Sequence, residues 1–282
     1  MSGILTIAHL TLHEALRRKI VLVALVLGIG FLIIFGLGFL AVINTTPNSP
    51  VPRAPFIAGQ QFIAIAFVVM AGLYAVNFLL VMMAALMPVD TISGEIRSGA
   101  IQTLATKPLR RSQILLGKWL GFWVILALYF LLMAGGVILI AQVFSGYAPP
   151  NVLEGMALML LKGTLLLTLS IAGGTRLSTL ANGVMVFGMY GLAFIGGWVE
   201  QIGALLGNDG ATNIGIVASL LMPSEALWNL AAYNMQPAVM RDLNITPFSP
   251  ASVPSASMVA WAVAYLLVVL GFGLRQFETR DL

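Results

Sequence analysis

DTISGEIRSGAIQTLATKPLRRSQILLGK, the segment from Asp90 to Lys118, gathers charge in the middle of an apolar chain. Charged residues are 9% of the protein, yet seven stand here: Asp90, Glu95, Arg97, Lys107, Arg110, Arg111 and Lys118. An apolar run long enough to cross a bilayer lies on each side of the segment. We therefore expect a loop over residues 88–113 that joins two membrane-spanning helices.

The composition of the whole chain points to a membrane protein. Hydrophobic residues are 60% of its 282 residues and the mean hydropathy is +1.00, which is more apolar surface than a soluble domain of this size can bury. We expect an all-α integral membrane protein. The chain has no cysteine, which excludes disulfides, thiol catalysis and cysteine-ligated metals.

Six apolar segments have the length of a membrane-spanning helix, about 20 residues. They cover roughly residues 20–43, 61–87, 114–144, 153–172, 179–199 and 258–274. We expect a single transmembrane domain over residues 1–282. The long extracytoplasmic segment 200–257 would carry two short interfacial helices that lie on or dip into the outer leaflet, anchored by Trp228 and Tyr233. It would serve as a lid, a docking surface for an extracytoplasmic protein, or a stiff connection.

Residues 1–19 have the pattern of an amphipathic helix that lies at the membrane surface. Its polar stripe is Thr6, His9, His13 and Arg17, and its apolar stripe is Leu5, Ala8, Leu12 and Leu16. Glu14 and Arg18 are spaced to form an ion pair along it. The two histidines have the spacing of metal ligands, but we interpret them as part of the polar face and expect no metal site.

The distribution of Lys and Arg predicts the orientation of the chain. With the amino terminus in the cytoplasm, the inner side would hold Arg17, Arg18, Lys19, Arg97, Lys107, Arg110, Arg111, Lys118, Arg176, Arg275 and Arg280. The outer side would hold Arg53 and Arg241. This asymmetry is typical of the positive-inside rule, so we expect both termini in the cytoplasm of a multi-pass cell-membrane protein.

No motif for catalysis or for an energy source is present in the sequence. It contains neither a phosphate-binding GxxxxGK[ST] loop nor an HExxH metal motif, so we expect no enzyme activity and no cofactor on this chain. Residues 93–97 and 100–104 favour a short helix in the charged loop, which Pro108 would end. That helix would be either a lever that a partner protein moves or a passive, solvated loop.

The pattern from Glu95 to Lys118 resembles one that follows the second span in permeases of the type-2 ABC exporter superfamily. The matching positions are Glu95, Gly99, Leu104, Thr106, Pro108, Arg111, Ile114, Gly117 and Lys118. The chain departs from the pattern at Ala100 and at Leu109-Arg110. The superfamily includes exporters of drugs, polysaccharides and lipids, as well as the permease of the nitrous oxide reductase maturation system, to which this sequence is similar.

The resemblance implies a coupling helix that docks on a separate cytoplasmic ATPase. Two permease copies and two ATPase copies would make the working unit, and ATP and Mg²⁺ would be bound by the ATPase. The docking residues would be Glu95, Arg97, Gly99, Leu104, Pro108 and Arg111. The amino-terminal segment with Glu14, Arg17 and Arg18 would be the elbow helix of this superfamily.

Two polar residues inside the spans bear on what is moved. Lys162 would face a translocation cavity together with Asn77, or would extend to the outer headgroups near Glu154. Because few polar groups lie in the spans, we expect a hydrophobic or amphipathic substrate. The alternatives are a force-transmitting subunit that serves an extracytoplasmic partner, and a secondary transporter, which the scarcity of carboxylates in the spans disfavours. Membrane lipid would surround the chain, and no nucleic acid is expected as a partner.

Overall fold

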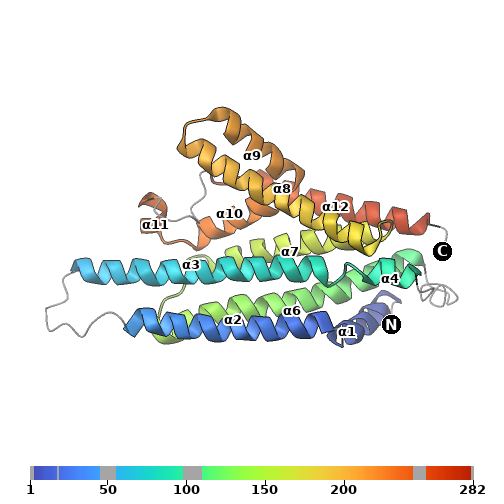
Figure 1. Ribbon diagram of the computed structural model, residues 1–282, viewed down its shortest axis with the longest axis horizontal. Coiled ribbons are helices and arrows are strands. Elements are labelled where there is room, and N and C mark those ends of the chain that lie inside the picture. Colours follow the sequence, from blue (N-terminus) through green and yellow to red (C-terminus); the bar gives the residue numbers. More distant parts are fainter. Residues whose placement is uncertain (1–2, 18, 45–54, 98–109, 244–251, 281–282) are drawn as a thin grey trace.

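The computed structural model describes residues 3–17, 19–44, 55–97, 110–243 and 252–280, and every regular element in these ranges is an α-helix (Figure 1). The helices are α1 (Gly3–Leu16), α2 (Lys19–Asn44), α3 (Pro55–Leu86), α4 (Thr91–Arg97), α6 (Arg111–Ser145), α7 (Val152–Gly174), α8 (Thr179–Leu205), α9 (Asp209–Leu221), α10 (Ser224–Met235), α11 (Ala238–Leu243) and α12 (Ala256–Glu278). The all-α prediction is confirmed.

Among the described residues, six helices are long and apolar enough to cross a membrane: α2, α3, α6, α7, α8 and α12. They correspond one to one with the six predicted spans. A helix pairs its backbone groups within itself, which is why it is a stable spanning structure where lipid offers no hydrogen bonds. The ends differ by a few residues: α6 begins at Arg111 rather than near 114, and α8 continues to Leu205.

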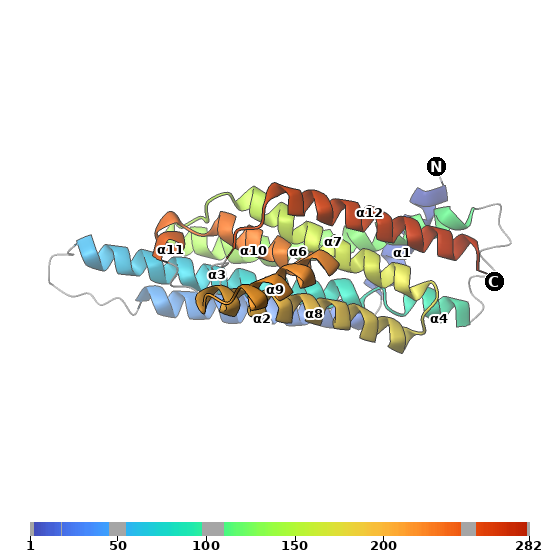
Figure 2. The same cartoon turned by 90° about the horizontal axis from the view of Figure 1, so that it is seen from above.

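The spans lie side by side along the long axis of the molecule (Figures 1 and 2). Both termini and α4 lie at one end of the bundle, here called the termini end, while α11 lies at the other, the distal end. The helix α7 contacts α3, α6, α8, α10 and α12. Of its apolar membrane-spanning stretch, 72% is buried inside the protein, whereas the corresponding share for α12 is 11%. The fourth span is therefore the central helix, and α2 and α12 present most of their surface to lipid.

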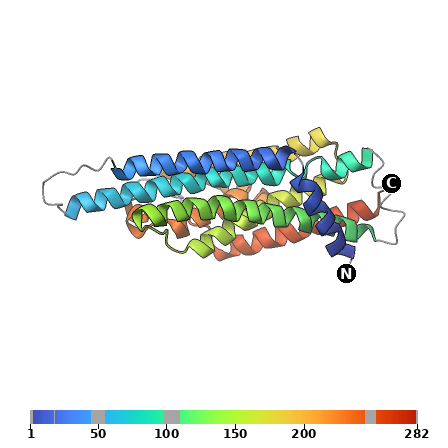
Figure 3. The same cartoon turned by 90° about the horizontal axis from the view of Figure 1, so that it is seen from below.

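The elbow helix α1 crosses α6 near the termini end (Figure 3). Two glycines of α6 make this contact close, because a Cβ at Gly117 would lie 2.6 Å from the Cβ of Ile7, and one at Gly121 would lie 2.8 Å from the carbonyl oxygen of Ala8. Small residues let helix backbones approach in this way where lipid gives no hydrophobic drive for association. Gly117, quoted above as part of a family pattern, thus has a packing role.

The face of α1 that packs against α6 differs from the predicted apolar stripe by about one position. Ile7 and Thr11 lie against glycines of α6, and Ala15 is also buried. Leu5 and Leu16 of the predicted stripe are more than half exposed, as side chains that face lipid would be. The sequence pattern did not predict a helix packed on α1, and the contact with glycines selects the side chains that fit over α6.

The segment after α8 turns back toward the middle of the bundle. Helices α9 and α10 meet at a bend of 104°, so that α9 leads inward beside α8 and α10 leads out again (Figures 1 and 2). We call them the re-entrant pair. The two short helices were predicted, but Trp228 is no interfacial anchor: it is 2% exposed and packs edge-on against Tyr74 of α3.

We predict that Gly117→Leu destabilises the protein by about 1–3 kcal/mol, because the added side chain overlaps Ile7 and the Ile4 carbonyl of α1. Denaturant unfolding in detergent micelles measures the effect. Gly135→Leu, in the same helix α6 with no atom within 4 Å of an added Cβ, is the matched control and should leave stability unchanged or raise it. Equal losses in both variants would contradict the role of Gly117.

Candidate functional site

The structure describes the two ends of the charged loop between α3 and α6. Glu95 and Arg97 belong to α4, and their side chains lie outside the described residues. Gly99, Leu104 and Pro108 also lie outside them, as does Arg18 of the elbow segment. Their predicted docking roles therefore stay predictions. Other residues, which the structure describes, hold the two ends of the loop in place.

The start of the loop is bound to the turn between α7 and α8. Thr179 donates a hydrogen bond to Asp90 over 2.6 Å between Oγ1 and Oδ1, and its Oγ1 lies 2.9 Å from the Ser93 hydroxyl. The Asn182 amide donates to the carbonyls of Val89, at 3.4 Å, and Ser170, at 2.8 Å. Since Ser93 and Asn182 are buried, these bonds replace water that the groups lose on folding.

The end of the loop is bound to the last turn of α12. The Arg111 guanidinium donates to the backbone carbonyls of Glu278, at 3.2 Å, and of Arg280. Carbonyls at a helix C-terminus have no partner within the helix and carry partial negative charge, so a cation there is favourable. Arg111 was predicted to dock on an ATPase; in the structure its side chain holds the C-terminal end of α12.

Further bonds join α12 to the same α7–α8 turn. The Arg280 guanidinium donates to the Thr175 carbonyl, and the Thr175 hydroxyl lies 3.0 Å from the Gln276 amide oxygen, to which it donates. Both ends of the charged loop thus connect with residues 175–182. We call this set the loop-base cluster: Asp90, Ser93, Arg111, Thr175, Thr179, Asn182, Gln276 and Arg280. A displacement of the loop would reach α7, α8 and α12 through it.

Sequence reasoning missed most of the loop-base cluster. The polar residues Thr175, Thr179 and Asn182 lie at the end of the fourth span and the start of the fifth, and they are neutral and common near turns. A run of neutral polar residues between two spans is only a weak indication of a functional contact. Its pairing with Asp90 and Ser93, about ninety positions away, depends on which helices become neighbours.

A buried ion pair joins the fourth span to the re-entrant pair. Lys162 of α7 has an exposed fraction of 0%, and its Nζ lies 3.2 Å from the Glu225 Oε2 of α10, a side chain that is 8% exposed. The ring of Tyr190 lies 5.2 Å from the same Nζ, a distance that favours a cation–π contact. A buried charge is tolerated when it is paired and hydrogen-bonded, so each partner accounts for the burial of the other.

The structure differs from both readings of Lys162 given above. The side chain is enclosed in this conformation rather than open to a cavity, and it turns to Glu225 rather than to the surface near Glu154. Glu154 instead accepts a hydrogen bond from the Asn234 amide at 3.4 Å. Glu225 was missed because it lies 63 positions from Lys162 in a segment that we expected at the surface.

Other polar side chains in the spans are also paired within the bundle. The indole N–H of Trp119 donates to Thr168 at 2.9 Å, and that of Trp123 donates to Thr164 at 3.0 Å. Both bonds tie α6 to α7. Asn77 is 2% exposed, and its Oδ1 has no hydrogen-bond partner among the described residues. Apart from such residues, the side chains buried between the spans are mostly apolar.

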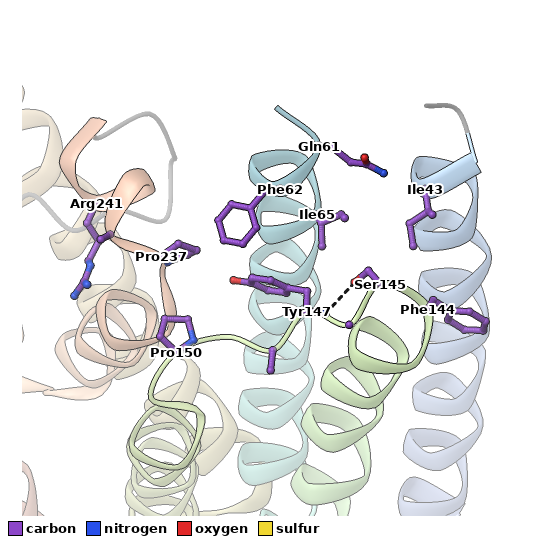
Figure 4. A pocket seen from close by; sticks show the side chains of 13 residues that line it. Ile43, Gln61, Phe62, Ile65, Phe144, Ser145, Tyr147, Pro150, Pro237 and Arg241 are labelled. Atoms are coloured by element: carbon purple, nitrogen blue, oxygen red, sulfur yellow. Dashed lines mark hydrogen bonds between the residues drawn. The ribbon is translucent and has the colours of Figure 1, made fainter. Parts of the chain in front are cut away.

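A cavity of about 930 Å³ opens at the distal end (Figure 4). Apolar side chains make up much of its lining, among them Ile43, Phe62, Ile65 and Phe144, and Gln61, Ser145, Tyr147 and Arg241 add polar groups. Burial raises the pKa of Tyr147 to about 12, so the hydroxyl stays protonated at neutral pH. This mixed lining suits an amphipathic molecule better than a sugar or an ion.

The two histidines of α1 lie next to each other on its exposed side. The His13 Nδ1 is 3.1 Å from the His9 carbonyl oxygen, and the two rings are 4.4 Å apart between centroids. Within the ranges that the structure describes, no group of three His, Asp or Glu side chains could hold a metal ion.

We predict that Lys162→Met destabilises the protein by about 3–5 kcal/mol, because Glu225 would keep a buried charge without a partner. The double variant Lys162→Met/Glu225→Met should recover much of that loss, since it leaves no charge behind. Chemical unfolding of the detergent-solubilised protein measures both. Lys19→Met, at an exposed lysine, is the control and should change stability by less than about 0.5 kcal/mol. Additive losses in the double variant would argue against a direct pair.

Comparison with known proteins places these features in a family. The family described as ABC-2 family transporter protein matches residues 5–282. The probable ABC transporter permease protein NosY of Pseudomonas aeruginosa is 36% identical over 107 residues, 36% of this chain and 39% of that protein. NosY of Stutzerimonas stutzeri, described in the same words, is 46% identical over 59 residues, 21% of each.

The matched regions cover less than half the length of these two curated relatives. The family match, by contrast, extends over nearly the whole chain, and the six spanning helices agree with it. The chain belongs to the ABC-2 transporter family and is a membrane subunit of an ABC transporter.

Proposed function

We propose that this chain is the permease of an ATP-driven exporter, in which two copies of it work with two copies of a separate ATPase. The observation that carries the proposal is the family match over residues 5–282. The ATPase would bind ATP and Mg²⁺, and closure of its two copies would move the charged loop of each permease. The loop-base cluster supports this, because it ties both ends of the loop to the spans.

The termini end would face the cytoplasm. The described Lys and Arg residues at this end are Arg17, Lys19, Arg97, Arg110, Arg111, Lys118, Arg176, Arg275 and Arg280, whereas Arg241 belongs to α11 at the distal end. Loops on the cytoplasmic side of a membrane protein are enriched in these residues. The orientation also puts the charged loop within reach of a soluble ATPase.

The substrate would be hydrophobic or amphipathic. Thr164 and Thr168 accept hydrogen bonds from α6, and Lys162 is paired with Glu225, so these three enclosed polar groups are not free to bind a sugar. The distal cavity, with apolar walls and a few polar groups, fits the same class of molecule. It would be the place from which cargo leaves.

A second candidate function is force transmission to a protein on the distal side. It is favoured by the burial of α10 in the bundle, which gives the distal end a firm connection to the fourth span. In that case the complex would hydrolyse ATP without moving a small molecule. A distal protein that copurifies with the complex, together with ATP hydrolysis that no amphipathic compound stimulates, would distinguish it from export.

We expect Glu95→Ala and Gly99→Trp each to abolish the stimulation of the ATPase by the permease, because both alter the proposed docking helix. The measurement is ATP hydrolysis by the complex reconstituted in liposomes, compared with the ATPase alone. Asp209→Ala, exposed at the start of α9, and Gly38→Trp, with open space around an added Cβ, are the matched controls and should keep full stimulation.

Copurification tests the proposal at a coarser level. A tagged permease should bring down an ATPase subunit in equal amounts, and the two docking variants should lose it or fail to stimulate it. Normal stimulation in both Glu95→Ala and Gly99→Trp would remove the docking assignment. A permease that works without any nucleotide-hydrolysing partner would remove the proposed function itself.

A further inference from the structure

We infer that the Lys162–Glu225 pair locks α10 to α7, so that the fourth span and the re-entrant pair move as one body. The inference rests on the proposed function, because it assigns a role in an ATP-driven cycle. It concerns two positioning residues and not a binding site.

Helices α7 and α10 run antiparallel and are held at both ends of their contact. Near the middle of the bundle the contact is the Lys162–Glu225 pair. Toward the distal end a Cβ at Gly155 would lie 2.4 Å from the Met235 side chain, so the two helices approach closely. The Asn151 amide also donates to the Asn234 carbonyl, at 3.4 Å. Two separate anchor points prevent α10 from pivoting on α7.

The ion pair fixes the register of the two helices. Two helices packed through apolar surfaces can shift along each other at little cost in free energy, since one methyl group can take the place of another. A shift of α10 by one helical turn, about 5.4 Å, would separate Lys162 from Glu225 and leave two buried charges unpaired. The pair therefore allows one alignment of α7 and α10 and disfavours its neighbours.

Two other contacts of α10 are made through a ring and through aliphatic groups. Trp228 meets Tyr74 of α3 with ring centroids 5.4 Å apart, and Gly197 of α8 lies against the aliphatic part of Glu225. Contacts of this kind tolerate a small shift more readily than a buried ion pair does. We expect relative motion at the distal end between α10 and α3 or α8, while α7 and α10 stay together.

The termini end of α7 is joined to the loop-base cluster. Ser170 donates to the Ala85 carbonyl of α3 at 3.0 Å, and Thr175 accepts from Arg280. A displacement of the charged loop would reach α7 there, and the locked contact would carry it to the re-entrant pair. The fourth span would thus transmit a displacement from the termini end of the bundle to the distal end.

The absence of cysteine makes a disulfide test direct. In the variant Gly155→Cys/Met235→Cys, the two thiols should form a bond in high yield in the isolated chain. In the complex with its ATPase, the yield should be the same without nucleotide and with ATP plus vanadate. The oxidised complex should keep its ATP hydrolysis. Ser93→Cys/Thr179→Cys, whose hydroxyls lie 2.9 Å apart, reports the efficiency of oxidation.

Removal of the ion pair should release the contact. In the background Lys162→Met/Glu225→Met, the yield of the 155–235 disulfide should fall several-fold when ATP and vanadate are added, and it should stay high in Lys162→Arg. Thermal unfolding of each variant separates a loss of locking from a loss of fold. A folded double variant with an unchanged yield in both states would overturn the inference.

Two further outcomes would also overturn it. If the disulfide blocks ATP hydrolysis in the otherwise unchanged complex, α7 and α10 must move relative to each other. If the isolated chain does not form the disulfide at all, the contact itself is absent. The measurement of disulfide formation in the isolated chain needs no ATPase, so its result stands whether or not the proposed function holds.

Discussion

A polar side chain inside an apolar bundle has to find its partner within the protein, because neither lipid nor water is there to supply one. This constraint explains the contacts of α7. Lys162 pairs with Glu225, Thr164 and Thr168 accept from indoles of α6, and Ser170 donates to a carbonyl of α3. Each bond also decides which helix lies next to α7. The fourth span is central because its polar groups need neighbours on several sides.

Close contact between helix backbones is the second feature that determines how the helices pack. Gly117 and Gly121 bring α1 onto α6, and Gly196 and Gly215 bring α8 and α9 together at distances that a larger side chain would prevent. In lipid, apolar side chains gain little by leaving one apolar surrounding for another, so helices associate through fit and dispersion. The elbow helix is thereby part of the packed structure as well as a surface element.

The sequence was sufficient for features that depend on local composition. The six spans, the amino-terminal helix and the two short helices after α8 follow from runs of apolar residues and from the polar breaks between them. The position of the charged loop followed in the same way. Each of these features is decided within about thirty residues of chain, the length of one helix and its ends.

Features that depend on which helices become neighbours could not be predicted. Lys162 was read as a cavity or surface residue because its partner belongs to an element that was expected outside the bundle. The contact of Arg111 with the C-terminal carbonyls of α12 was not predicted, because α12 begins more than 140 positions later. The face of α1 that packs on α6 was not predicted because the glycines that select it lie on α6.

The bend of 104° between α9 and α10 has a consequence for sidedness. A segment that enters the apolar layer and turns back leaves through the surface by which it came, and so adds no crossing. With the six spanning helices that the described residues contain, the number of full crossings would stay even, and both chain ends would lie in the same compartment. A reporter fused to either end would sample that compartment, whereas one inserted in the α6–α7 connection, residues 146–151, would sample the opposite one.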